Sequence, residues 1–346
     1  MNTVHNHAER PADQKPGARK GLVPCAHSAL TRRASHLKRF SMSNIEWTEQ
    51  TWNPTTGCDR ISPGCDNCYA LTMAKRLKGM GQAKYQNDGH PKTSGPGFAL
   101  TVHPDVLTEP LRWKKPRKVF VNSMSDLFHA RVPHDFLARV FAVMAATPQH
   151  TYQILTKRPE RAARILTDLC TCGVGHPPGE HFRSSMEWAA TSHSPTYVPG
   201  LEHGIYHRSG WPLPNVWIGT SIESDDYTRR ADALRNTPAA VRFISAEPLL
   251  GPLPSLDLTG IDWLILGGES GPGARVLEPW WIDDLIYEAR QAGAAPFVKQ
   301  LGSVWARDFT IAGKTVAAHG DTKGGNPDHW PSRLRVREYP KAATSA

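Results

Sequence analysis

Short apolar, β-branched runs alternate along the chain with segments of helical periodicity. Between the runs, apolar residues repeat with a period of about 3.6 residues, as they do across 136–144 and across 281–289. Strands that are apolar on consecutive residues are buried on both faces, as in parallel sheets. The alternation predicts an α/β fold, a (βα) barrel that is partly or fully closed. The predicted strands are residues 119–123, 152–156, 216–221, 241–245, 262–267 and 296–300.

Two segments depart from this alternation. Residues 170–214 are rich in His, Gly, Ser and Pro, and we expect them to form an inserted loop. Residues 1–42 carry eight Lys and Arg against two acidic residues and lack apolar periodicity, which predicts a disordered basic arm. Met42 resembles a natural start, so we interpret the arm as upstream sequence translated from an early start codon, with nucleic-acid binding as the alternative. Residues 43–346 are expected to form the barrel domain.

Composition favours a cytoplasmic protein with a large core. The chain is 39% hydrophobic, and no apolar run approaches the ~18–20 residues that span a bilayer. No early apolar stretch resembles a secretory signal. Six cysteines in 346 residues are too few for a disulfide-stapled secreted fold. Most of the net charge of +9 falls on the basic arm, so the remaining chain lacks the charge of a strong duplex binder.

Polar or glycine residues follow almost every predicted strand. Sites in βα barrels form at the C-terminal ends of the strands, so we expect these side chains to share one rim. A lone Ser or Thr there is ordinarily a helix N-cap. Glu223, Glu247 and Glu269 would repel one another unless a cation or a hydrogen-bonding ligand lay among them. They therefore predict a site in which a carboxylate matters more to ligand binding than to folding.

Three cysteines give the sharpest local signal. Cys58, Cys65 and Cys68 fall within eleven residues, and three thiolates on one loop suit a soft metal centre. A helical pattern from Tyr69 to Lys78 places the last thiolate at a helix N-terminus, where negative charge is favoured. No fourth Cys or His stands nearby, which favours a [4Fe–4S] cluster with one open iron over structural zinc. A zinc knuckle completed by a distant ligand stays open.

The cysteine motif is part of a longer pattern. Trp47-Thr-Glu-Gln-Thr-Trp-Asn-Pro-Thr-Thr-Gly-Cys58 and Ser62-Pro-Gly-Cys65-Asp-Asn-Cys68-Tyr69-Ala resemble a phage- and prophage-associated family of unknown function that is marked by a three-cysteine motif. That family is similar, more distantly, to radical S-adenosylmethionine enzymes, with spore photoproduct lyase as the nearest familiar relative. Later segments match in the same order: Leu155-Thr-Lys-Arg-Pro, Asn215-Val-Trp-Ile-Gly-Thr-Ser-Ile-Glu, Ser245-Ala-Glu-Pro-Leu, Gly267-Gly-Glu-Ser and Trp330-Pro-Ser-Arg-Leu-Arg-Val-Arg-Glu.

This resemblance implies a barrel of the radical S-adenosylmethionine type with a [4Fe–4S] cluster on Cys58, Cys65 and Cys68 and the sulfonium cofactor on the fourth iron. It implies that one electron, from a donor such as flavodoxin or ferredoxin, cleaves the cofactor to methionine and a 5′-deoxyadenosyl radical. A nucleic-acid base or nucleotide is the expected substrate. The expected cofactor contacts are Tyr69, Asn122, Ser123, Ser125, Ser221, Glu223, Glu247 and Glu269. The expected contacts to an anionic substrate are Lys157, Arg158 and Lys299.

Two features depart from most of that superfamily. The first gap, Cys58-x6-Cys65, is longer than the usual three residues. The Gly267-Gly268-Glu269 segment comes too late to be the element that binds the methionine amino group, whose place falls on residues 122–125.

A second class of function also stays open. Residues 112–118 carry five cations around Trp113, which is typical of a phosphate-contacting segment with a stacking ring and equally of a solvated linker. The alternative is therefore a zinc-stabilised, non-catalytic protein that binds nucleic acid or a host partner. The strand-end carboxylates favour the enzyme, because a binding module needs no convergent acidic rim.

Overall fold

The computed structural model describes residues 46–168 and 172–341. The expected arm at residues 1–42 lies outside the described residues, as do residues 169–171 and 342–346. The fold described below belongs to the unit Ser41–Ala346.

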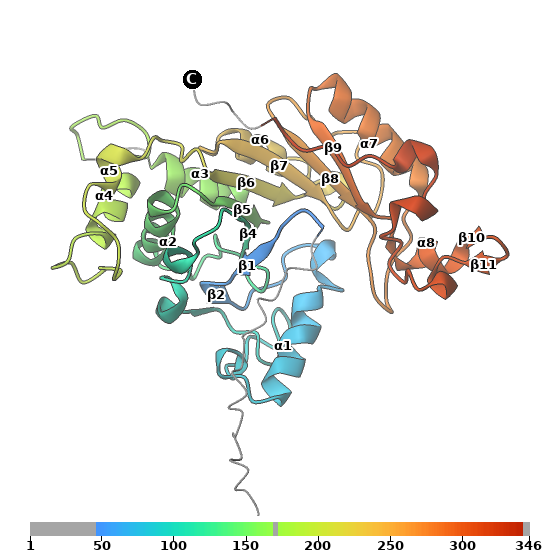
Figure 1. Cartoon of the computed structure of the whole chain (residues 1–346), viewed down its shortest axis with the longest axis horizontal. Coiled ribbons are helices and arrows are strands. Elements are labelled where there is room, and N and C mark those ends of the chain that lie inside the picture. The colour runs from blue at the N-terminus through green and yellow to red at the C-terminus, as the bar shows by residue number, and fades with distance from the viewer. Residues whose placement is uncertain (1–45, 169–171, 342–346) are drawn as a thin grey trace, which may run out of the picture. The chain divides into compact units, whose positions relative to one another are not determined.

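Seven parallel strands form the central sheet, in the order β1-β4-β5-β6-β7-β8-β9. Within the described residues β1 and β9 do not pair, so the curled sheet of Figure 1 is an open half-barrel. The predicted α/β fold is confirmed in its partial form. The strands are β1 (Gln50–Trp52), β4 (Lys118–Val121), β5 (Thr151–Thr156), β6 (Val216–Ser221), β7 (Val241–Ala246), β8 (Trp263–Gly267) and β9 (Ala295–Gln300).

Helices cover one face of this sheet. Alternate strand residues such as Ile154, Ile218 and Leu264 pack in one core with apolar helix residues such as Phe141 and Ile286. The helices that follow β4, β5, β6 and β8 are α2 (His134–Ala146), α3 (Pro159–Thr167), α6 (Arg230–Arg235) and α7 (Pro279–Gln291). The periodicity predicted α2 and α7 correctly, and α7 ends just before Gly293, whose φ of 80° is left-handed.

Aromatic side chains fill the concave face of the sheet toward the start of the strands. The ring of Trp47 lies 4.9 Å from Phe120 of β4, 6.2 Å from Phe243 of β7 and 5.9 Å from Trp263 of β8. Two strands separate β4 from the adjacent pair β7 and β8, so one ring meets all three only because the sheet curls around it. Side chains alternate along a strand, so Ser245 and Glu247 share the inner face with Phe243. Residues at the C-terminal ends of the strands therefore lie above a layer of apolar side chains on the concave face.

The insertion contains helices where the sequence predicted a loop. Helix α4 (Glu180–Ala189) and the short α5 (Ile205–Arg208) lie between α3 and β6. Phe182, Met186 and Ala189 are buried, and the Phe182 ring packs 5.2 Å from Phe141 of α2. The loop prediction was wrong for these residues, because the polar composition concealed an i, i+4, i+7 apolar spacing that α2 covers.

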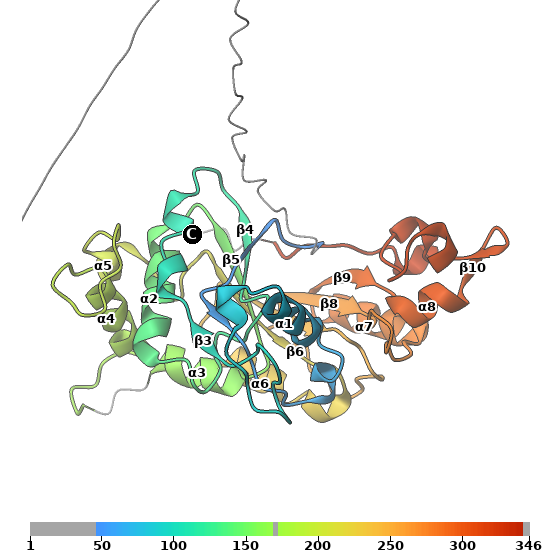
Figure 2. The same cartoon turned by 90° about the horizontal axis from the view of Figure 1, so that it is seen from below.

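The remaining elements lie outside the main sheet. Figure 2 shows α4 and α5 grouped with α2 at one end, and α8 with β10 at the other. None of the helices in the described part of the chain combines the length and the apolar character needed to cross a bilayer. The elements outside the sheet are α1 (Tyr69–Gly79), α8 (Gly302–Asp308), the pair β2 (Thr55–Thr56) and β3 (Thr101–Val102), and the pair β10 (Thr310–Ile311) and β11 (Lys314–Thr315).

Candidate functional site

The segment Gly57–Cys68, here called the cysteine loop, begins beside the C-terminal end of β4. Gly57 pairs with Ser125, whose Oγ donates to the Gly57 carbonyl at 2.6 Å. Gly57 has a φ of 84°, and a Cβ there would lie 2.1 Å from the carbonyl oxygen of Ala99, so no other residue fits. At its far end, Cys68 is the N-cap residue of α1. The predicted placement of the last cysteine at a helix N-terminus is confirmed.

The three thiols of the loop are half-buried, and burial favours the neutral form of Cys58 and Cys68. Burial and the nearby Asp126 carboxylate raise the pKa of Cys58 to about 12, although Arg158 acts in the opposite direction. Burial also raises the pKa of Cys68. Arg158 Nη1 lies 3.6 Å from Cys58 Sγ, close enough to donate to it. A metal centre would therefore have to displace protons from these thiols, and Arg158 would then stabilise the thiolate of Cys58.

The three sulfurs are spaced more widely than one metal ion requires. Among the described residues, the ligand atoms of three Cys, His, Asp or Glu side chains come within 4.8 Å of one another in the insertion and not in the cysteine loop. Three thiolates that bind one zinc ion at ~2.3 Å hold their sulfurs ~3.8 Å apart. At least one pair of sulfurs in the loop is therefore farther apart than it would be around a single zinc ion.

Glu223, two residues beyond β6, ties the cysteine loop to the sheet. Its side chain is fully buried, and Oε1 accepts a hydrogen bond from the Gly64 N–H at 3.3 Å. Oε2 accepts from Lys157 Nζ at 3.1 Å and from Arg230 Nη1 at 3.0 Å. Burial alone would raise the pKa of Glu223, but Lys157, a hydrogen bond from Ser62 and Arg230 together lower it. The carboxylate therefore stays ionised and paired.

Glu269, two residues beyond β8, makes the second tie to the loop. Arg275 Nε and Nη2 donate to its two oxygens at 2.9 and 2.6 Å, and Asn67 Nδ2 donates at 3.0 Å. The same guanidinium donates to the Pro63 carbonyl at 3.0 Å. Burial would raise the pKa of Glu269, yet the hydrogen bonds from Arg275 and Asn67 lower it.

Glu247, just beyond β7, pairs with a lysine of β9. Lys299 Nζ lies 2.6 Å from Glu247 Oε1, and the two side chains are 17% and 18% exposed. Each of the three predicted carboxylates thus has a cation from the protein itself. The sequence led us to expect a cation or a hydrogen-bonding ligand among these carboxylates, and the cations are Lys157, Arg230, Arg275 and Lys299 of the protein itself.

The predicted residues after β4 are engaged in contacts that join neighbouring segments. Asn122, with a φ of 63°, donates to Thr55 Oγ1 at 2.8 Å and accepts from the Thr55 N–H at 3.2 Å. Ser123 Oγ donates to Asn53 Oδ1 at 3.2 Å, and its carbonyl accepts from the hydroxyl of Tyr69. Tyr69 is 56% exposed. These side chains, like Ser125, fix the start of the cysteine loop, and their role toward a cofactor stays a prediction.

Asp126, which is buried, organises the residues after β5. Its Oδ1 accepts from Thr156 Oγ1 at 2.7 Å, and its Oδ2 accepts from the Lys157 N–H at 3.1 Å and Arg158 Nη1 at 2.8 Å. Lys157 and Arg158 are therefore held at the rim by contacts with the protein. Their predicted contact with a substrate is not tested by these positions. Ser221, at the end of β6, is also buried.

Asp59 is a site residue that the sequence did not reveal. It follows the first cysteine and accepts from Thr93 Oγ1 at 2.8 Å, His129 Nε2 at 2.9 Å, Arg131 Nη2 at 3.0 Å and the hydroxyl of Ser94. Burial opposes ionisation, but these hydrogen bonds hold the pKa of Asp59 well below its usual range. Burial and the Arg158 charge lower the pKa of His129, so a neutral imidazole donates the N–H.

The basic segment at residues 112–118 lies at the other end of the sheet. Lys118 is the first residue of β4, whereas the cysteine loop meets the residues after that strand. Trp113 packs against the core, and the Arg117 guanidinium lies 5.7 Å from its ring. The tryptophan is therefore part of the fold and not an open stacking surface beside the cysteines.

A family model described as "Protein of unknown function (DUF5131)" matches residues 42–331. The chain belongs to this family. The DUF5131 match includes the cysteine loop and every strand end described above. No solved structure matches the chain. Membership of a family of unknown function is thus confirmed, while the phage association and the likeness of DUF5131 to radical S-adenosylmethionine enzymes stay predictions.

Proposed function

We propose that this DUF5131 protein is a radical S-adenosylmethionine enzyme that carries a [4Fe–4S] cluster on Cys58, Cys65 and Cys68. The observation that carries the proposal is the position of the cysteine loop. Its backbone and Asn67 contact Glu223 and Glu269, which follow two strands of a parallel half-barrel. Sites in βα folds form at this end of the strands, so the thiols lie where a site is expected.

The donor set fits such a cluster. Three thiols come from one loop, with a wider spacing than one zinc ion requires. Arg158 provides an N–H beside Cys58, and hydrogen bonds to the sulfurs tune iron–sulfur clusters. When bound, the cluster and S-adenosylmethionine supply an organic radical by one-electron cleavage of the sulfonium.

The residues of this chain then divide into those that position the cysteine loop and those that would bind the cofactor. Glu223 and Glu269 are positioning residues, because each is buried and contacts the cysteine loop. Glu247 and Lys299 are partly exposed on the inner face and provide a carboxylate and an ammonium for a cofactor that carries both charges. The aromatic layer beneath them excludes water from that side.

The proposed substrate is a nucleic-acid base or nucleotide, with Lys157, Arg158 and Lys299 toward its anionic groups. The proposed electron donor is a flavodoxin or ferredoxin. The alternative, a zinc-stabilised binding protein, has less support, because the basic segment at 112–118 starts β4 at the opposite end from the cysteine loop.

Anaerobic reconstitution tests the proposal. The protein should bind about four irons and a matching amount of sulfide per chain. On reduction with S-adenosylmethionine it should release methionine and 5′-deoxyadenosine. Single changes of Cys58, Cys65 or Cys68 to Ser should abolish iron binding, whereas Cys172→Ser, outside the loop, is the matched control and should keep it. Stoichiometric zinc on the cysteine loop without sulfide would contradict the proposal.

A further inference from the structure

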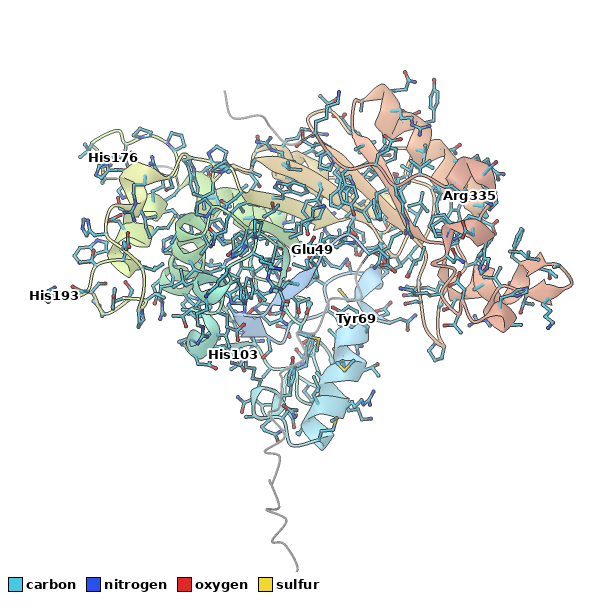
Figure 3. All side chains as sticks on the ribbon, in the orientation of Figure 1. Glu49, Tyr69, His103, His176, His193 and Arg335 are labelled. Atoms are coloured by element: carbon cyan, nitrogen blue, oxygen red, sulfur yellow. The ribbon has the colours of Figure 1, made fainter. Side chains whose placement is uncertain are left out.

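A second set of metal-ligating side chains lies in the insertion. Cys172, His176 and His181 each place one ligand atom so that all three atoms lie within 4.8 Å of one another. Cys172 Sγ and His176 Nδ1 are 3.2 Å apart, and the rings of His176 and His181 have centroids 4.9 Å apart. Figure 3 shows His176 at the end of the molecule that carries α4 and α5, away from Tyr69 and the cysteine loop.

The 3.2 Å pair and the 4.8 Å limit on the other two separations are compatible with one tetrahedral ion. With zinc–sulfur bonds of ~2.3 Å and zinc–nitrogen bonds of ~2.0–2.1 Å, neighbouring ligand atoms lie ~3.4–3.6 Å apart. The pair Cys172 and His176 is already at 3.2 Å, so small side-chain shifts would complete the geometry. The cysteine loop differs, because its three sulfurs do not all lie within 4.8 Å of one another.

The backbone around the triad is shaped to bring its members together. Gly173, Gly175 and Gly179 have φ values of 82°, 76° and 83°, a conformation that glycine adopts without strain. Gly179 is the N-cap residue of α4, and a Cβ there would lie 2.5 Å from Trp211 Nε1. The loop therefore turns tightly before the helix begins.

One ligand of the triad stands on a fixed element. His181 is the second residue of α4, next to Phe182, which is buried against α2. The other two ligands lie on the preceding loop. An ion bound by all three would fasten the loop to the helix, and its binding energy would add to the stability of the insertion.

We propose that Cys172, His176 and His181 bind one structural zinc ion that fastens residues 172–178 to the start of α4. A thiolate with two imidazoles is a typical zinc donor set, whereas Mg²⁺ and Ca²⁺ prefer oxygen ligands. The fourth ligand comes from outside this triad. The site is independent of the cysteine loop and of the proposed radical chemistry.

Metal analysis of the full-length chain, purified anaerobically from zinc-containing medium, tests this site. Cys172→Ser and His176→Ala should each contain about one zinc fewer per chain than the wild type, with iron content unchanged. The matched control is His193→Ala, because His193 is an exposed histidine of the same insertion that contacts Ser192 at 3.2 Å. The control should keep its zinc. Unchanged zinc in both triad variants, or equal loss in the control, would overturn the proposal.

Cobalt binding to the folded wild-type chain distinguishes the loss of a metal ligand from the loss of metal through misfolding of a variant. Co²⁺ in the triad should give a thiolate-to-metal charge-transfer band that disappears in Cys172→Ser and persists in Cys58→Ser. A chelator should lower the melting temperature of the wild type and leave that of His176→Ala unchanged, because a ligand that binds only the folded state stabilises it. A band that depends on Cys58 and not on Cys172 would place the ion in the cysteine loop and overturn the inference.

Discussion

Replacing Glu223 by Gln should destabilise the fold by about 3 kcal/mol. The amide keeps the shape and can still accept from the Gly64 N–H, but it removes the charge that faces Lys157 and Arg230. Those two side chains are only 17% and 4% exposed, so they would remain buried without a counter-charge. Breaking a buried pair costs about 3–5 kcal/mol, and the partial exposure of Lys157 places the loss at the lower end.

This reasoning reverses the expectation from the sequence, in which a carboxylate at a strand end matters more to binding than to folding. The loss corresponds to a melting temperature lower by about 5 °C for a domain of this size. The reversal has a single cause. Glu223 is fully buried and compensates two cations of the protein, whereas the sequence led us to expect a carboxylate that mainly serves a ligand.

The effect should depend on pH in a definite direction. The folded-state pKa of Glu223 is lowered, so its ionised form stabilises the native state above the unfolded pKa of about 4.3. That stabilisation is lost as the pH falls through the folded pKa. The stability difference between wild type and Glu223→Gln should therefore be constant above about pH 5.5 and shrink progressively below about pH 4.3.

Urea unfolding of the two proteins across this pH range measures the prediction. The matched control is Glu338→Gln, whose partner Arg290 lies at 2.9 Å with both side chains about half exposed, and which should cost less than about 1 kcal/mol. Adding Lys157→Met to Glu223→Gln should recover part of the loss, because one uncompensated charge is removed. A loss no larger than that of the control, or one that does not shrink at acid pH, would refute the reasoning.

Two further changes test the fold. Gly219→Ala should cost about 1–3 kcal/mol by urea unfolding, since its Cβ would lie 2.4 Å from the buried ring of Phe243. Gly251→Ala, with nothing within 4 Å, is its control, and equal losses would contradict the packing argument. A chain that starts at Met42, where the family match begins, should keep its melting temperature and metal content. A clear loss of either would show that the preceding residues are structural.

The strands were predictable because their apolar character is local. Residues 216–221 were expected as a strand and form β6, and the other predicted strands agree with β4, β5, β7, β8 and β9 within about two residues. The first strand of the sheet was missed. β1 (Gln50–Trp52) has three residues, two of them only partly buried, and it exists because Val119–Val121 pair with it across the sheet. No pattern within residues 50–52 indicates that partner.

The site was predictable in position but not in pairing. The C-terminal ends of parallel strands meet at one edge, so the sequence alone predicts Glu223 and Glu269 beside the cysteines. Their partners Arg230 and Arg275 follow at seven and six residues, in segments with no special pattern. A sequence gives the sign of a charge, whereas the choice of partner depends on how the chain returns to the edge of the sheet.

The exposed fraction of each carboxylate side chain distinguishes two roles at the C-terminal edge of the sheet. The side chains of Glu223 and Glu269 are 0% and 6% exposed, and each contacts the cysteine loop. A ligand that replaced the cations paired with them would therefore also disturb the contacts that hold the loop. Glu247 is 18% exposed, and its hydrogen bond described above is to Lys299 and not to the cysteine loop. A ligand can take the place of Lys299 there at little cost in buried charge, since both groups already reach water. For the proposed cofactor, we therefore predict that binding specificity depends on the residues after β7 and in β9, while the residues after β6 and β8 hold the cysteine loop in place.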